Sequence, residues 1–75
     1  LYTMKKIKKI KIKVNGKLKS ILDNYKMSDL VKNLKIPIKK VAIELNQEIV
    51  DKKNINKINL KDNDKIEIVH FIGGG

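Results

Sequence analysis

The chain contains no cysteine, no tryptophan and no arginine, and aromatic residues make up only 4% of it. Without cysteine there is no disulfide framework, no thiolate zinc site and no cysteine nucleophile. The missing arginines and scarce aromatics argue against a nucleic-acid-binding module, because guanine is read by arginine and bases stack on aromatic rings. The apolar runs are far shorter than the roughly 20 residues of a membrane helix. The single His70 cannot build a metal site alone.

Lysine is abundant in the chain. All 18 basic residues are lysines, against 8 acidic residues, which gives a formal net charge of +10. Because isoleucine and asparagine are also frequent, we interpret the lysines mainly as the product of AT-rich coding at solvated positions. The charge should still favour encounters with acidic partners.

A chain of 75 residues forms one small domain. We place this domain at residues 4–72 and a flexible glycine tail at residues 73–75. Residues 1–3 precede Met4 and are interpreted as a cloning or processing remnant. No apolar segment follows the early lysines, so we find no secretory signal.

Alternating apolar and charged residues predict strands, because successive side chains of a strand point to opposite faces. Residues 9–14 show this alternation. The following Asn15-Gly16 predicts a tight hairpin, since both positions of such a turn need positive φ, and residues 17–22 then return as a second strand. Further strands are predicted at residues 41–45, 48–50 and 65–71, with turns at Asn46-Gln47 and Asp62-Asn63-Asp64.

One short helix is predicted between the second and third strands. Ser28 is a suitable N-cap, and Asp29 suits the positive end of the helix dipole. The helix ends by Ile36, because Pro37 disfavours α geometry in the residue before it. Its buried face follows the i, i+3, i+4, i+7 spacing and consists of Met27, Leu30, Val31 and Leu34.

The order β-β-α-β-β-β predicts an α+β fold with one helix packed on one face of a mixed sheet of four to five strands. The first and last strands can then lie side by side in the middle of the sheet, which is the ubiquitin-like β-grasp arrangement. The other face of the sheet stays open to solvent or to partners.

Parity along the last strand assigns its side chains to the two faces. Glu67 is not expected to be buried unpaired, so its face is the open one, and Val69 and Phe71 share that face. These two residues form an apolar spot at the base of the glycine tail, within a lysine-rich surround. We therefore predict a partner-docking patch of Val69, Phe71 and Ile72. His70 is expected to be a tucked-in residue of the core or rim and not a catalytic base.

The chain ends in Gly73-Gly74-Gly75 directly after this strand. Glycines lack Cβ atoms, so such a tail can enter a channel that other residues would block. We predict that the α-carboxyl group of Gly75 is the functional group, carried by the tail residues Gly73 and Gly74.

Residues 41–50 and 64–75, together with the Asn15-Gly16 hairpin, resemble the ThiS family of sulfur carriers of thiamine biosynthesis. The resemblance covers essentially the whole chain from Met4. Many members have glycine where Gln47 and Asn63 stand. Asn63 is a soft replacement because asparagine tolerates the left-handed conformation, whereas Gln47 is less comfortable and could shift its turn by one residue.

The resemblance implies a carrier that is acted on by enzymes and is not itself an enzyme. A ThiF-like adenylating enzyme would activate the Gly75 carboxylate with ATP, and a sulfur-transfer protein or cysteine desulfurase would supply the sulfur. The resulting thiocarboxylate would donate sulfur to a ThiG-like thiazole synthase. No cofactor is expected on the carrier, which would be a monomer when free, in a bacterial cytoplasm or a plastid stroma.

Two relatives in fold remain as alternatives. One is a small subunit of molybdopterin synthase, which shares the fold and the thiocarboxylate chemistry. The other is a ubiquitin-like covalent modifier, in which Gly75 would form an isopeptide bond with a lysine. The residues contain no paired acid and base and no cofactor loop that would support a catalyst.

Overall fold

The computed structural model describes residues 8–71 of the chain. The predicted order β-β-α-β-β-β is confirmed, with two additional 3-10 helices, η1 and η2. No helix within the described range is long and apolar enough to cross a membrane. The elements are β1 (Lys9–Val14), β2 (Lys17–Leu22), α1 (Met27–Asn33), η1 (Ile38–Lys40), β3 (Val41–Leu45), β4 (Glu48–Ile49), η2 (Lys52–Lys57) and β5 (Lys65–His70).

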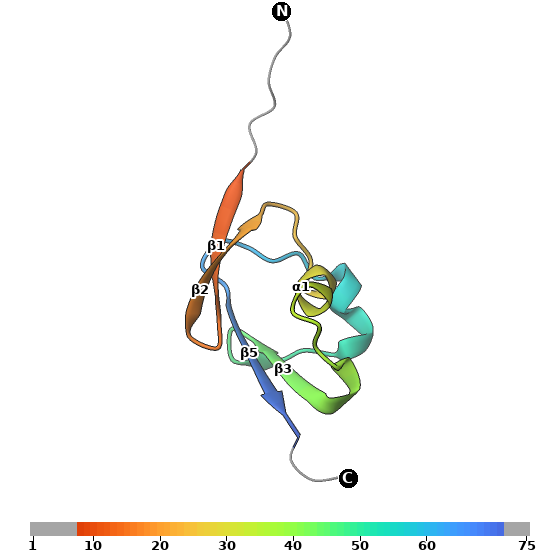
Figure 1. Ribbon diagram of the computed structural model, residues 1–75. Helices are drawn as coiled ribbons and strands as arrows, with labels where there is room; N and C mark the ends of the chain where they lie inside the picture. Colours follow the sequence, from red (N-terminus) through yellow and green to blue (C-terminus); the bar gives the residue numbers. More distant parts are fainter. Residues whose placement is uncertain (1–7, 72–75) are drawn as a thin grey trace, which may run out of the picture.

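The five strands form one mixed sheet in the order β2-β1-β5-β3-β4. The central pair, β1 and β5, is parallel, and every other pair is antiparallel. Helix α1 packs across one face of this sheet (Figure 1). The predicted α+β fold class is therefore confirmed, including the central placement of the first and last strands.

Two-residue turns join the strands of both hairpins. Asn15 and Gly16 have φ values of 50° and 82°, as the Asn-Gly pair predicts. Asn46 and Gln47 have φ values of 51° and 72°, and the register that they close pairs Leu45 with Glu48. Gln47 therefore does not shift the turn; it adopts the left-handed conformation in place.

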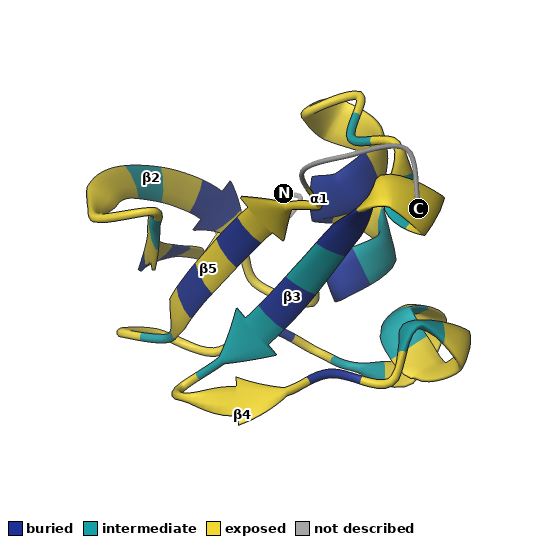
Figure 2. Cartoon of the chain, turned by 90° about the horizontal axis from the view of Figure 1, so that it is seen from below, coloured by how far each residue is buried: buried dark blue, intermediate teal, exposed yellow. Residues whose placement is uncertain are grey.

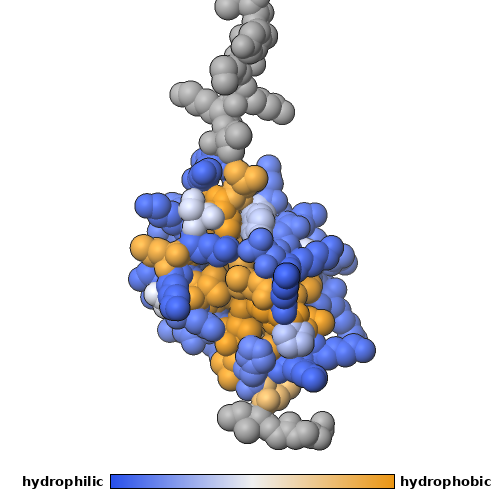
Figure 3. Space-filling model, viewed as in Figure 1, coloured by the Kyte–Doolittle hydropathy of each residue, from blue (hydrophilic) through white to orange (hydrophobic). Residues whose placement is uncertain are grey.

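The core lies between the sheet and α1. Figure 2 shows the alternation of buried and exposed residues along β5, and Figure 3 shows hydrophilic residues around an apolar centre. Leu34 was expected in this core but is 39% exposed, because α1 ends at Asn33 and Leu34 is its C-cap. The fully buried side chains are Ile12, Met27, Leu30, Val41, Ile43, Leu60 and Ile66.

The predicted N-cap at Ser28 is wrong. The helix begins at Met27, which is 0% exposed, and Lys26 is the N-cap. The Met27 N–H donates to the Ile58 carbonyl at 2.9 Å, so tertiary packing draws the helix start upstream. The predicted role of Asp29 in the first turn holds, because its carboxylate accepts a hydrogen bond from the Lys26 N–H at 2.8 Å.

Candidate functional site

Strand β5 carries the core on one side and the predicted docking residues on the other. Ile66 and Ile68 are 1% and 8% exposed, whereas Val69 and Phe71 are 55% and 59% exposed. The parity argument therefore placed these four side chains correctly. Ile72 and residues 73–75, which complete the predicted site, lie outside the described residues.

The ring of Phe71 is fixed by more than its strand. Its backbone N–H donates to the Lys40 carbonyl at 2.9 Å, which extends the pairing of β3 and β5 by one residue. The Lys52 ammonium nitrogen lies 5.4 Å from the centre of the ring, a cation–π contact. The same ammonium group donates to the carbonyl oxygens of Ile38 and Val41 at 3.0 and 2.8 Å. Phe71 is thus an exposed aromatic side chain held against the edge of the sheet.

Other exposed apolar residues share this open face. Val69 lies opposite Ala42 in the register of β3 and β5, and Ile49 of β4 lies opposite Glu44. Ile49 is 79% exposed on the β4 edge of the sheet, and Glu44 and Glu67 lie between it and Val69 on the open face. At the other edge, Leu18 and Leu22 of β2 are 69% and 49% exposed. The predicted patch does not include Leu18, Leu22 or Ile49. Parity along β2 and β4 places all three on the open face, so the sequence pattern contains the signal for them.

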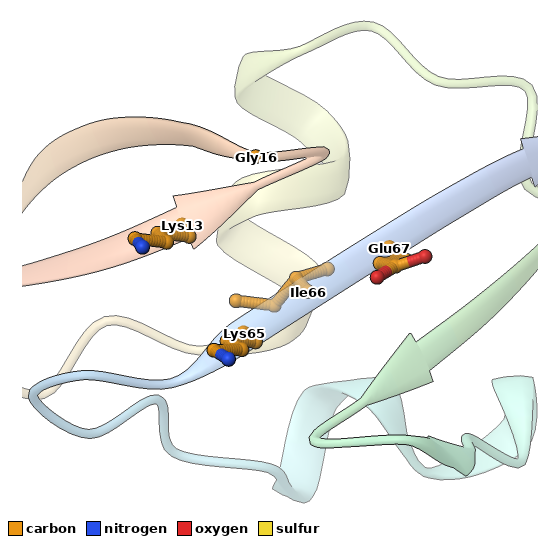
Figure 4. A pocket seen from close by; sticks show the side chains of 5 residues that line it. All are labelled: Lys13, Gly16, Lys65, Ile66 and Glu67. Carbon is orange, nitrogen blue, oxygen red and sulfur yellow. The ribbon is translucent and has the colours of Figure 1, made fainter.

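The charges of the open face are arranged in like pairs. Lys13 lies opposite Lys65, and Glu44 lies opposite Glu67. Figure 4 shows Lys13, Lys65 and Glu67 around a shallow depression between β1 and β5, which Gly16 and Ile66 complete. Like charges opposite one another destabilise a sheet. The two pairs of like charge are therefore an unfavourable contribution to the stability of the sheet.

His70 is exposed, so the prediction that it is tucked into the core or rim is wrong. It pairs with Val41, the first residue of β3, at the end of the sheet. Helix α1 has seven residues and spans about 10 Å, so it is too short to cover the whole length of β5. No group of three or more His, Cys, Asp or Glu side chains that could hold a metal occurs among residues 8–71.

A mixed five-stranded sheet, one helix across it and a central last strand that leads to terminal glycines define a ubiquitin-like β-grasp protein that carries a tail. The family model of the ThiS family matches residues 12–75, which includes the glycines. The chain belongs to the ThiS family.

Individual relatives agree with this assignment. The chain is 40% identical over 65 residues to the sulfur carrier protein ThiS of Bacillus subtilis, a match that covers 85% of this chain and 98% of the relative. The crystal structure of the thiamine biosynthesis protein ThiS from Geobacter metallireducens superposes with a TM-score of 0.77 at 29% identity, over 88% of this chain and 100% of that one. The predicted ThiS family is confirmed. The prediction that the protein is a carrier and not an enzyme is confirmed as well.

A relative of another kind is the thiazole synthase of Paramagnetospirillum magneticum. It is 38% identical over 66 residues, which cover 88% of this chain but 20% of the relative. The chain therefore spans about a fifth of that protein, and what matches is a carrier-like segment within a longer chain.

Proposed function

We propose that the α-carboxylate of Gly75 is converted to a thiocarboxylate and donates its sulfur to form the thiazole ring of thiamine. The observation that carries the proposal is the family match over residues 12–75, which runs through the terminal glycine. In the described structure, the central strand β5 leads directly toward that end.

Activation is needed because a carboxylate is a poor electrophile. In the proposed first step, a ThiF-like enzyme joins the Gly75 carboxylate to the α-phosphate of ATP and releases pyrophosphate. The terminal sulfur of a donor persulfide then attacks the acyl carbon, the new C–S bond forms, and AMP leaves as the C–O bond breaks. A second thiol of the donor attacks the resulting acyl disulfide, which releases the thiocarboxylate and leaves the donor as a disulfide. The thiocarboxylate is nucleophilic and can be delivered into a closed site protected from water.

The thiazole synthase relatives support the last step of this sequence. In two of them, a carrier-like segment shares one chain with the remainder of a thiazole synthase. Joining two units in one chain raises the effective concentration of each for the other. We propose a ThiG-like thiazole synthase as the acceptor, with a sulfur-transfer protein or cysteine desulfurase as the source of sulfur.

Contacts made by the folded domain must supply the binding free energy, because ordering the tail in an active site is unfavourable. Ordering a flexible residue costs about 1–2 kcal/mol, and the tail must enter more than one active site. Gly75 is the fourth residue after Phe71, so an extended tail would reach about 13–14 Å beyond the Phe71 position. We propose that Val69 and Phe71 dock the carrier so that this length suffices.

Intact mass spectrometry of the carrier purified with its partners tests the chemistry. The expected result is replacement of one oxygen by sulfur at the C-terminus, and deletion of Gly75 should abolish it without unfolding the domain. Sulfur acceptance by the truncated protein would refute the proposal. A lysine-linked conjugate would instead indicate a covalent modifier, and complementation of a molybdopterin mutant but not a thiazole auxotroph would indicate molybdopterin synthase.

Binding measurements test the docking surface. Phe71→Ala should weaken binding to the ThiF-like enzyme by about 30-fold, the effect of losing one aromatic hot spot of about 2 kcal/mol. Leu22→Ala is the matched control, because Leu22 is also an exposed apolar residue of the open face but lies on the outer strand β2. Equal affinity of the Phe71→Ala variant and the wild type would exclude this surface.

A further inference from the structure

The side chain of Asn15 joins the end of β1 to β5 by hydrogen bonds. Asn15 directly follows β1, has a φ of 50°, and begins the turn into β2. Its backbone N–H donates to the Ile66 carbonyl at 2.9 Å, which continues the parallel pairing of β1 with β5. After this bond the main chain turns away, so β1 offers β5 no further peptide groups.

The carboxamide of Asn15 takes the place of the missing peptide group. Its Oδ1 accepts a hydrogen bond from the Ile68 N–H at 2.7 Å, and its Nδ2 donates to the Ile68 carbonyl at 3.2 Å. A side-chain amide has the same donor and acceptor as a backbone peptide. Asn15 therefore extends the β1–β5 ladder by one residue, across 53 positions of sequence.

This contact marks the last two-sided support of β5. The register of β1 and β5 comprises only Lys13 with Lys65 and Val14 with Ile66, and Figure 4 shows β5 continuing past the turn. On the side facing β3, pairing continues to the Phe71 N–H. Among residues 8–71, Ile68 is the last residue of β5 whose backbone groups are hydrogen-bonded on the side that faces β1. Beyond it, the strand that leads to the tail is held from one side alone.

A second asparagine makes an equivalent arrangement at the opposite end of β5. Asn46 also begins a two-residue turn, with a φ of 51°. Its N–H donates to the Lys65 carbonyl at 2.8 Å, and its Oδ1 accepts from the Lys65 N–H at 2.9 Å. Its Nδ2 donates to the Asp64 carboxylate at 3.0 Å. The two asparagines hold opposite ends of β5, Asn15 from the β1 side and Asn46 from the β3 side.

We propose that Asn15 is a positioning residue that fixes the end of β5 from which the tail departs. It does not touch the reacting carboxyl group; it acts through Ile68 on the adjacent docking residue Val69 and on Phe71. Without it, the end of β5 opens more often, and only the closed fraction presents the docking surface. Apparent affinity falls in proportion to that fraction. This inference rests on the proposed function, because it assumes that the tail is activated by a docked enzyme.

The test compares Asn15→Gly with Asn46→Gly. Glycine suits the positive φ of both turns, so each variant keeps its turn and loses its side-chain hydrogen bonds. Two quantities are measured: amide hydrogen exchange in the free carrier, and steady-state ATP–pyrophosphate exchange by the purified ThiF-like enzyme with varied carrier. Asn15→Asp serves as a second variant, because it keeps the Oδ1 acceptor but replaces the Nδ2 donor with a charged carboxylate oxygen that repels the Ile68 carbonyl.

For Asn15→Gly, we expect at least tenfold faster exchange at the amides of Ile68 and Phe71, whose N–H groups bond to Asn15 and Lys40, than in the wild type. We also expect about a tenfold rise in the KM for the carrier, with kcat within twofold. Asn46→Gly should accelerate exchange at Lys65 and leave KM unchanged, and Asn15→Asp should raise KM as Asn15→Gly does, because repulsion replaces the bond to the Ile68 carbonyl. A general loss of stability would raise KM equally in both glycine variants, which would overturn the proposal.

Two further outcomes would also overturn it. Unchanged exchange at Ile68 would show that Asn15 does not hold the end of β5. Faster exchange with an unchanged KM would show that the held end does not matter for docking, while leaving the proposed function intact. A wild-type carrier that supports no pyrophosphate exchange would refute the proposed function itself, and the role of Asn15 in docking with it.

Discussion

Replacing Gln47 with glycine should stabilise the domain. Gln47 has a φ of 72°, within the left-handed region, and it is exposed at the β3–β4 turn. A residue other than glycine, asparagine or aspartate loses about 1–2 kcal/mol in this conformation. Glycine has greater freedom in the unfolded chain, which offsets about 0.5–1 kcal/mol of the gain. The net stabilisation should be about 0.5–1 kcal/mol.

Thermal and urea unfolding followed by circular dichroism measure this gain. For a domain of this size, the expected rise in Tm is about 2–8 °C. Gln47→Ala is the control, because it removes the same side chain but keeps the Cβ atom that causes the strain. If Gln47→Ala stabilised the domain as much as Gln47→Gly, the conformational argument would be wrong and the side chain itself would be the cause.

Three smaller predictions concern contacts of the described residues. Lys52→Met should lower the free energy of unfolding in urea by about 1–2 kcal/mol, because it removes charged hydrogen bonds to two carbonyl groups. Lys53→Met, at an exposed position of η2, should leave that free energy almost unchanged. Burial, followed by the charge of Asp29, raises the pKa of Tyr25, so the fold holds the phenol proton longer than the unfolded chain does. Stability should therefore fall as pH rises above about 10, and less steeply in Tyr25→Phe. Asp29→Ala should destabilise the domain by about 1 kcal/mol in thermal unfolding through loss of the bond to the Lys26 N–H.

The local pattern of the chain predicted the sheet well, because strand period and turn chemistry are short-range properties. The alternation in residues 9–14 and the Asn15-Gly16 turn together define a hairpin before any tertiary contact forms. The predicted range of β2 and the central position of β5 also agree with the structure. Parity then placed Val69 and Phe71 on the open face, because they lie on the same side of the strand as the charged Glu67.

The errors occur where a tertiary contact competes with a local preference. The start of α1 was misplaced because the Met27 N–H bonds to Ile58, a contact that the helix sequence does not contain. His70 was expected to be covered, but the length of α1 leaves that end of the sheet open. The roles of Asn15 and Lys52 were missed for the same reason, since each binds backbone groups far along the chain.

Strand β5 separates the demands of folding and of recognition by alternation. Ile66 and Ile68 face the core, whereas Val69 and Phe71 are exposed beside the departing tail. Under the proposed function, the Gly75 carboxylate lies within about 13–14 Å of Phe71, so we expect each enzyme that receives it to contact the same exposed residues. The adenylating enzyme and the sulfur acceptor would then bind one at a time. Loading and delivery of sulfur would be ordered by competition for one surface, without any conformational switch in the carrier.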